Sequence, residues 1–484
     1  MDRISIDPIT RLEGHGKIDI FLDDEKNVEN AYLQIPEFKG FEQFCRGRRA
    51  EDMPTITSRI CGVCPVAHHL AATKALDDAY NVEPTDTALK LRELIYNGYI
   101  YADHLLHFYF LASPDFLVGS DAPPEKRNIL GVIEKVGLDM GKKVIRERAK
   151  GQKIISTLGG KAVHPCFGVP GGVTKGLGRE EREVIQAMSL GMVEFSRISL
   201  EIFKEQVLEV YRETIVEDRL ELYSMGLVED GKLSHTGGTV KVVDQNGKSH
   251  ESFTGADYLE IIGEHVEPWS YMKFPYLKKV GWKGFAEGPE SGIYRVGTLG
   301  RLNVADGMKT PLAQKEFREM FDLLGKPVHS TLAYHWARLI EVMQAAELVN
   351  QLTESDDIEG DDIRNEPGEP GRGVGIVEAA RGTLIHDYEL DGDGLLTDVN
   401  LIVATTHNAA PISMSIRDAA RKYVHGGDIT PGMLNNVERA FRAYDPCFAC
   451  ATHSVMGETP LKVTLYDSKK KEYAAMSQGL GDGE

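Results

Sequence analysis

Two C-x-x-C pairs at opposite ends of the chain constrain its fold more than any other feature. Cys61 and Cys64 lie in Arg-Ile-Cys-Gly-Val-Cys, and Cys447 and Cys450 lie in Asp-Pro-Cys-Phe-Ala-Cys. Two thiolates at this spacing can bind one metal ion, so the two pairs together predict a four-sulfur site. We therefore expect the fold to bring both pairs together at its centre.

The cysteines alone leave the kind of metal open. A structural zinc ion and an iron–sulfur cluster both accept four thiolates. Structural zinc usually staples a short segment, whereas these pairs are far apart. A histidine also follows each pair, at His68 and at His453. Both features favour a site other than structural zinc. The remaining Cys45 and Cys166 cannot form a cluster by themselves, and we expect Cys166 to be buried by packing.

Composition excludes several classes of protein. The 484 residues carry a formal net charge of −19, which argues against nucleic-acid binding. No apolar run is long enough to span a membrane, and the first residues lack the pattern of a signal peptide. Six cysteines are too few for a disulfide framework. We expect a cytoplasmic protein, in which clustered cysteines indicate metal or redox chemistry.

Hydrophobic periodicity predicts a helical core with β-rich margins. Apolar residues recur at three- and four-residue steps in 86–111 and 180–211 and again after Ser330, a plausible helix N-cap. Residues 4–33 read as short strands. Residues 222–310 are richer in glycine and β-branched residues and contain an Asn-Gly hairpin signal. The acidic stretch 353–373 reads as a solvated loop.

Along nearly its whole length the chain resembles the large subunit of nickel–iron hydrogenases. Four motifs carry this resemblance: Arg11-Leu-Glu-Gly-His15, Phe38-Lys-Gly-Phe-Glu42, Arg59 to His68 and Asp445 to His453. Further stretches are similar to the soluble NAD-coupled branch of that family: Asp121 to Asn128, Trp269 to Tyr276, Thr310 to Gln314 and Val403 to Asn408.

The resemblance implies a nickel–iron centre. All four cysteines would bind nickel; Cys64 and Cys450 would bridge to an iron that carries carbon monoxide and cyanide, while Cys61 and Cys447 would be terminal. Dihydrogen would be cleaved heterolytically, with the proton taken up by Cys447. His68 would donate a hydrogen bond to a bridging sulfur.

Other residues take roles from the same resemblance. Glu13 would relay the proton outward, although most single glutamates of this kind are surface residues. Glu42, the main-chain carbonyl of Leu401, and His453 would hold a second metal, magnesium or iron. Without its motif, Glu42 would read as an ordinary carboxylate on a helix face.

An arginine and three polar side chains complete the implied site. Arg381 would lie over the iron and donate to one cyanide, and Thr405 would bond the other. Asp103 and Asp445 would orient Arg381. The family often has proline at the position of Ala380, so the backbone beside Arg381 departs from the family pattern here.

The chain has no second cluster or flavin motif to receive electrons, so it needs partners. The resemblance implies an iron–sulfur small subunit, followed by diaphorase subunits with iron–sulfur clusters and FMN that reduce NAD. The alternatives are coupling to NADP, a deazaflavin or ferredoxin, or bifurcation of electrons between NAD and ferredoxin. A nickel-free coupling subunit related to complex I is a distant alternative, and a structural zinc protein is a more distant one.

The expected fold is that of the family. It is mainly α with α+β margins, in which a long central helical bundle is flanked by small peripheral sheets. Residues 1–453 would form one hydrogenase large-subunit domain. Residues 454–484 would be a C-terminal propeptide, which a maturation protease removes after nickel-insertion proteins have loaded the site.

Overall fold

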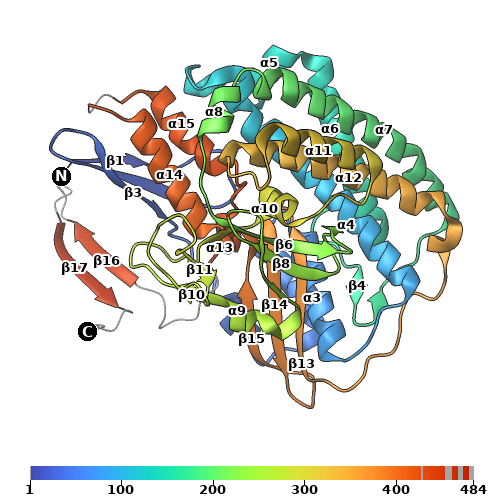
Figure 1. Ribbon diagram of the computed structural model, residues 1–484. Coiled ribbons are helices and arrows are strands. Elements are labelled where there is room, and N and C mark those ends of the chain that lie inside the picture. Colours follow the sequence, from blue (N-terminus) through green and yellow to red (C-terminus); the bar gives the residue numbers. More distant parts are fainter. Residues whose placement is uncertain (1, 427–428, 453–460, 467–471, 479–484) are drawn as a thin grey trace.

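Long helices form the body of the molecule, and small sheets lie at its margins (Figure 1). The computed structural model describes the chain except for residues 1, 427–428, 453–460, 467–471 and 479–484. The helices are α1 (Phe41–Cys45), α2 (Met53–Thr57), α3 (Pro65–Ala79), α4 (Asp86–Leu106), α5 (Ile129–Val136), α6 (Leu138–Gly159), α7 (Arg179–Phe203), α8 (Arg212–Glu217), α9 (Tyr258–Ile261), α10 (Gly297–Val304), α11 (Pro311–Leu324), α12 (Tyr334–Glu354), α13 (Ala404–His407), α14 (Ala409–Tyr423) and α15 (Pro431–Arg442).

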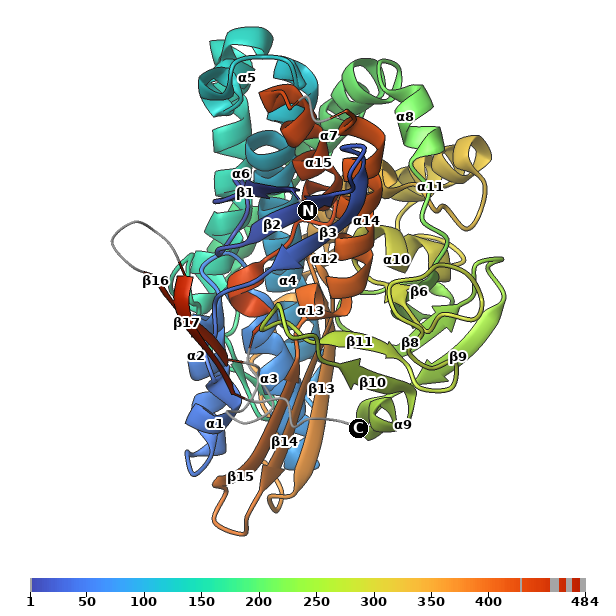
Figure 2. The ribbon, with the colours of Figure 1, turned by 90° about the vertical axis from the view of Figure 1, so that its left-hand side faces the viewer.

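Helices α4, α6, α7 and α12 form the central bundle, in which α4 packs on α6 and α12 packs on both α4 and α7 (Figures 1 and 2). Thr85 caps α4 by accepting a hydrogen bond from the amide of Ala88 at 3.2 Å. Small residues let α4 and α6 approach closely, because a Cβ on Gly151 would lie 2.4 Å from the carbonyl oxygen of Gly98. The bundle follows from the periodic apolar residues, and the mainly helical class is confirmed.

The sheets are small and mostly antiparallel. β1 (Asp2–Ile6), β2 (Lys17–Leu22) and β3 (Val28–Gln34) form the N-terminal sheet, and β13 (Arg372–Ala379), β14 (Gly382–Leu390) and β15 (Leu396–Ile402) form a second one. A five-stranded sheet contains β6 (Tyr223–Glu229), β7 (Lys232–Leu233), β8 (Thr239–Val243), β9 (Ser249–Phe253) and β12 (Tyr294–Arg295). The two-stranded pairs are β4 (Gly168–Val169) with β5 (Gly172–Val173), β10 (Ile262–His265) with β11 (Phe274–Leu277), and β16 (Leu461–Tyr466) with β17 (Glu472–Gln478).

Two packing contacts bring segments from the two halves of the chain together. Helix α3 lies directly on β13, where a Cβ on Gly375 would come within 2.0 Å of the carbonyl oxygen of Ala71. Strand β3 packs against α14, so the N-terminal sheet lies beside the C-terminal helices (Figure 2). All four clustered cysteines belong to the same hydrophobic core.

Most expected elements are present, with local differences. The acidic stretch 353–373 is a loop only in part, because it begins in the last residues of α12, contains the 3-10 helix Asp356–Glu359 and ends in β13. The hairpin at Asn246-Gly247 joins β8 to β9, and Gly247 has the positive φ of 79° that such a turn requires. Ser330 precedes a 3-10 turn that leads into α12, but its side chain makes no capping hydrogen bond. Among the described helices, none combines the length and apolar character needed to cross a membrane.

Candidate metal centre

Each cysteine pair lies in a short turn beside a helix. Cys61 follows the 3-10 helix Ser58–Ile60, and Cys64 is the residue that precedes α3. Cys447 comes shortly after α15 and directly before the 3-10 helix Phe448–Cys450. All four cysteines are buried.

The four sulfur atoms form one cluster. The Sγ of Cys61 lies 3.4 Å from that of Cys447, and the Sγ of Cys64 lies 3.8 Å from that of Cys450. Cys447 and Cys450 are 2.6 Å apart at sulfur, which is longer than a disulfide bond of about 2.05 Å. All four ligand atoms lie within 4.8 Å of one another. Four buried thiols at this separation, none of them in a disulfide, fit a soft metal ion.

The surroundings of Cys61 favour a thiolate. Hydrogen bonds from Cys447 and the other clustered thiols lower the pKa of Cys61 well below its usual value. The amides of Val63 and Cys64 also donate to its sulfur, at 3.2 and 3.3 Å. The deprotonated form is the one that binds metal.

Glu13 is held against the C-terminal cysteine pair. Its backbone forms an isolated parallel β-bridge with Cys447, and its carbonyl oxygen accepts from the amide of Phe448 at 3.0 Å. The thiol of Cys447 donates to Oε2 of Glu13 at 2.8 Å. Burial and the charge of Cys61 raise the pKa of Glu13, while the hydrogen bond from Cys447 opposes the rise.

Arg381 lies between two carboxylates beside the cysteines. It donates to both carboxylate oxygens of Asp103 at 3.2 Å and to Asp445 at 3.2 Å. Burial raises the pKa of Asp445 to about 7, although the charge of Arg381 acts in the opposite direction. The Nε of Arg381 is buried and makes no hydrogen bond within the described residues. This orphaned donor is the feature expected beside an anionic metal ligand.

Two further backbone contacts shape this side of the site. The N–H of Ala380 donates to the hydroxyl of Tyr99 at 3.1 Å. A proline at this position could not make this bond. Thr405 Oγ1 accepts from the amide of Cys447 at 3.0 Å, which leaves its hydroxyl proton to donate elsewhere.

His68 lies in the first turns of α3 and is fully buried. Its Nδ1 is 3.2 Å from Nε2 of His386. Its Nε2 has no hydrogen-bond partner among the described residues. Burial lowers the pKa of His68 to about 4, so the ring is neutral near pH 7.

The structure places Glu42 beside Leu401, two of the three residues expected at the second metal, through the amide of Leu401 and not its carbonyl. Oε1 of Glu42 on α1 accepts from the amide of Leu401 on β15 at 2.9 Å. Burial raises the pKa of Glu42 to about 7, and Lys273 is among the charges that lower it. His453 lies outside the described residues.

Comparison with known proteins decides the family. A family described as nickel-dependent hydrogenase matches residues 39–123 and 216–453, which include both cysteine pairs. A HoxL-like family matches residues 3–38. The chain belongs to the nickel-dependent hydrogenases. It is a large, catalytic subunit of that family, with the four cysteines as the ligand set of the nickel–iron centre.

Individual relatives cover the chain from end to end. A relative from Archaeoglobus profundus, named as an iron-sulfur subunit of an F420-non-reducing hydrogenase, is 47% identical over 97% of this chain and 98% of the relative. The NAD-reducing hydrogenase HoxS subunit beta of Cupriavidus necator is 38% identical, over 96% of this chain and 97% of the relative. A crystal structure of an NAD+-reducing [NiFe]-hydrogenase in the H2-reduced state superimposes with a TM-score of 0.89 at 39% identity, covering 94% of this chain and 100% of that one.

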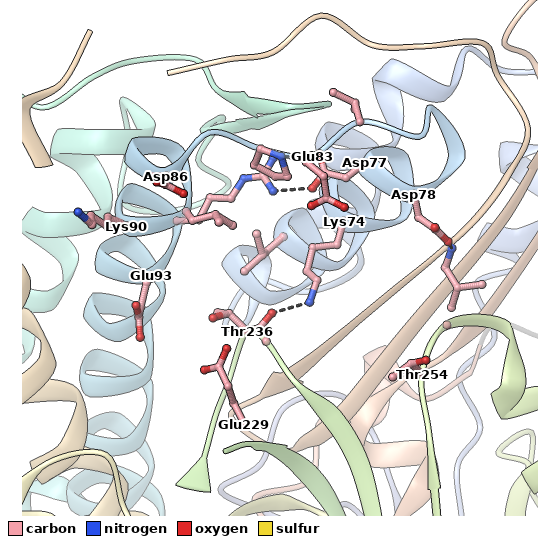
Figure 3. A pocket seen from close by; sticks show the side chains of 18 of the residues that line it. Lys74, Asp77, Asp78, Glu83, Asp86, Lys90, Glu93, Glu229, Thr236 and Thr254 are labelled. Atoms are coloured by element: carbon pink, nitrogen blue, oxygen red, sulfur yellow. Dashed lines mark hydrogen bonds and ion pairs between the residues drawn. The ribbon is translucent and has the colours of Figure 1, made fainter. Parts of the chain in front are cut away.

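The hydrogenase chain also contains a cavity that is separate from the cysteines. It measures about 730 Å³ and lies between the end of α3, the start of α4, the end of β6 and β13 (Figure 3). Several of its charged groups already have partners in the cavity wall, among them Lys309 with Glu229. Lys74 donates to the carbonyl of Thr236 at 2.5 Å, and Arg92 pairs with Asp77 at 2.5 Å. This cavity therefore offers no ligand set comparable to the four thiols.

Sequence reasoning missed a buried ion network behind Arg381. Arg301 pairs with Glu341 at 2.7 Å and with Glu378 at 2.8 Å, and the rings of His104 and His235 also contact Glu341. Polar residues on α12, a helix that is buried almost all round, were the available signal. The network supports the turn that carries Arg381, since Arg301 also donates to the carbonyls of residues 379 and 380.

One prediction about a cysteine was wrong. Cys166 is exposed, not buried. Its neighbours Pro165 and Phe167 are both buried, so the alternation of this extended segment turns Cys166 outward. The aromatic and proline side chains, not the thiol, anchor this loop.

Proposed function

We propose that this large subunit cleaves and forms dihydrogen reversibly and passes the electrons, through an iron–sulfur partner, to a ferredoxin-type acceptor. The observation that carries the catalytic part is the placement of Glu13 on Cys447, one of four buried thiols that lie within 4.8 Å of one another. A buried metal ligand in direct contact with a partly exposed carboxyl group can exchange protons with solvent.

The cysteines would divide the binding of the metals between them. Cys61 and Cys447 would be terminal ligands of nickel, and Cys64 and Cys450 would bridge nickel and iron. When bound, the nickel–iron centre supplies the redox chemistry and polarises dihydrogen. The protein's part is to hold four thiolates in a dry site and to accept the proton.

Proton movement would follow the contact between the two ends of the chain. Sγ of Cys447 takes up the proton and passes it to Oε2 of Glu13, 2.8 Å away. Cys447 is buried and Glu13 is partly exposed, so this step moves the proton outward. The raised pKa of Glu13 brings this carboxyl closer to the pH range in which it can both accept and release a proton.

Arg381 would contribute charge and a hydrogen bond. Asp103 and Asp445 fix its guanidinium group, and its buried Nε would donate to a cyanide on iron. The hydroxyl of Thr405 would donate to the other cyanide. Glu42 and the carbonyl of Leu401, with His453, would hold magnesium or iron at the second site.

The electron acceptor is argued from the relatives. Relatives at 46% and 47% identity are named as components of F420-non-reducing hydrogenases, whereas the NAD-reducing relative is 38% identical. These names argue against the deazaflavin F420, and the lower identity to the NAD-reducing relative places NAD second. We therefore take ferredoxin as the first candidate among the acceptors considered. NAD remains the second candidate, because the solved NAD+-reducing hydrogenase superimposes with a TM-score of 0.89.

The test uses the native complex that contains this chain. We expect about one nickel per chain with iron and little zinc, and infrared bands from iron-bound carbon monoxide and cyanide. Stoichiometric zinc without those bands contradicts a nickel–iron centre.

The electron acceptor is tested in a second assay. Dihydrogen is supplied with ferredoxin, NAD, NADP or F420 alone, and with ferredoxin and NAD together. We expect ferredoxin to be reduced when it is the single acceptor supplied. Reduction of NAD alone supports the second candidate, and reduction only with both present indicates bifurcation.

A further inference from the structure

A buried series of three side chains leads from the metal centre into the second sheet. Nδ1 of His68 lies 3.2 Å from Nε2 of His386, and Nδ1 of His386 lies 2.6 Å from the hydroxyl of Tyr388. All three residues are buried completely, with no exposed surface. The sequence motifs include only His68, so the other two are assigned no role by them.

The position of His68 directs its ring toward the cysteines. Cys64 immediately precedes α3 and His68 follows four residues later, so both lie on one face of the first turns. Side chains on a helix lean toward its N-terminus, which here is the cysteine end. The charge of Cys61 acts on the ring of His68, whose buried Nε2 has no partner among the described residues.

His386 and Tyr388 are held rigidly. Both lie on β14, the middle strand of the β13–β14–β15 sheet, and residues two apart on a strand share one face. His386 pairs with Gly375 on one side and Leu401 on the other. The backbone that carries both side chains is therefore fixed by two strand ladders.

The groups at the two ends of the series, the cysteines beside His68 and the phenol of Tyr388, decide which ring nitrogens of His68 and His386 carry protons. A neutral imidazole carries one N–H. A lone pair on Nε2 of His68 would be repelled by cysteine thiolates, whereas an N–H there would be attracted. His68 then accepts at Nδ1, so His386 donates from Nε2 and accepts at Nδ1 from the Tyr388 hydroxyl. Burial raises the pKa of Tyr388 well above its usual value, so this phenol keeps its proton.

We propose that His386 and Tyr388 are positioning residues that fix the tautomer and ring orientation of His68, so that its Nε2, unpartnered among the described residues, carries the N–H and presents it to the bridging cysteines. The inference rests on the function proposed above, since it concerns the same centre. A hydrogen bond to a bridging thiolate withdraws electron density from the sulfur and thereby from the iron. The series would thus tune the metal centre through His68, from residues on β14.

The test compares variants in the native complex. His386→Leu removes both hydrogen bonds, His386→Gln restores a donor in place of Nε2, and Tyr388→Phe removes only the phenol hydroxyl. Tyr294→Phe is the matched control, because Tyr294 is also buried and its hydroxyl lies 2.6 Å from Nδ1 of His407. Nickel content and the infrared bands of carbon monoxide are measured together with dihydrogen cleavage.

We expect the carbon monoxide band to move to lower frequency in His386→Leu and in Tyr388→Phe, and to return toward the wild-type position in His386→Gln. Activity should fall about 10- to 100-fold in His386→Leu.

If His386→Leu fails to retain nickel, recovery of nickel in His386→Gln supports the donor role of His386, and loss of nickel in both variants overturns it. Unchanged bands in His386→Leu and Tyr388→Phe, or an equal shift in Tyr294→Phe, also overturn it. A wild-type complex without dihydrogen cleavage instead contradicts the proposed function.

Discussion

Oε2 of Glu13 lies 2.8 Å from Sγ of Cys447, although 434 positions separate the two residues in the sequence. The contact is built into the backbone, because the two residues form a parallel β-bridge. Gly14 is required beside it. It has a φ of 87°, and a Cβ there would lie 2.5 Å from the amide nitrogen of Ala449. The Arg-Leu-Glu-Gly-His motif therefore serves to place one carboxyl group against one thiol.

Substitution of Glu13 should separate proton exchange from metal binding. We expect Glu13→Gln to retain nickel and the fold but to lose proton–deuterium exchange under dihydrogen, because an amide cannot accept and release a proton. The measurement is isotope exchange in the purified complex. Glu25→Gln, at an exposed turn, is the control and should exchange at the wild-type rate. Wild-type exchange in Glu13→Gln would remove Glu13 from the proton path.

Substitution of Arg381 should impair activity even where the charge is retained. Arg381→Lys keeps a positive charge but loses the planar group that bonds Asp103 at two atoms, and it loses the buried Nε. We expect dihydrogen cleavage to fall about 100-fold with nickel retained. Arg372→Lys is the matched control, since Arg372 makes a two-atom contact with Asp387 on the sheet surface. Equal activity in both variants would argue that charge alone suffices.

Asp115 joins the motifs from the two ends of the chain, and its loss should destabilise the subunit. It is buried and bonds Arg11, the first residue of the motif that contains Glu13, and Arg442, at the end of α15. Asp115→Asn takes a carboxylate away from the fully buried guanidinium of Arg442, which still contacts Glu438, and from the largely buried guanidinium of Arg11, at a cost of about 3 kcal/mol. We expect the thermal midpoint of the complex to fall by about 3 °C. Asp357→Asn removes only an exposed pair with Lys90 and should leave the midpoint unchanged.

The same variant has a defined pH dependence. Burial alone would raise the pKa of Asp115, but Arg442 and Arg11 hold it below its usual value. A carboxyl with a lowered pKa in the folded state stabilises it fully above the unfolded pKa of about 4, and this stabilisation is lost as the pH falls through the lower value. The difference in midpoint between wild type and Asp115→Asn should therefore be constant from neutral pH down to about pH 5 and shrink below about pH 4. A difference that grew on acidification would contradict this assignment.

The four-cysteine cluster and the long helices could be predicted from sequence because their signals are local. C-x-x-C spacing is short, and the apolar period of α4 is visible in about twenty consecutive residues, ample for a helix of that length. Pairing of Arg301 with Glu341 has no local signal, since neither residue shows which distant charge it meets. The same holds for His386, which comes beside His68 only through the packing of α3 on the second sheet.

Exposure of single residues was harder to predict than the elements. Burial of Cys166 was inferred from residue type, yet its two neighbours fill the interior instead. Ser330 has the residue type of an N-cap, but a 3-10 turn intervenes before α12 and its hydroxyl makes no capping bond. In both cases residue type indicated a general preference, and the backbone direction of a few residues decided the outcome.

The C-terminal tail gives the last prediction. Residues 454–484 follow His453, which closes the motif that begins at Asp445, and part of this tail forms the hairpin β16–β17. We propose that a maturation protease cleaves after His453 once nickel is bound, which frees the terminus of the segment that carries Cys447 and Cys450. Intact-mass measurement on nickel-loaded, active complex should give a chain ending at His453. A His453→Ala variant with a nickel-free, full-length chain would agree with cleavage that depends on loading. Full activity with Glu484 still attached would show instead that the hairpin is a permanent part of the protein.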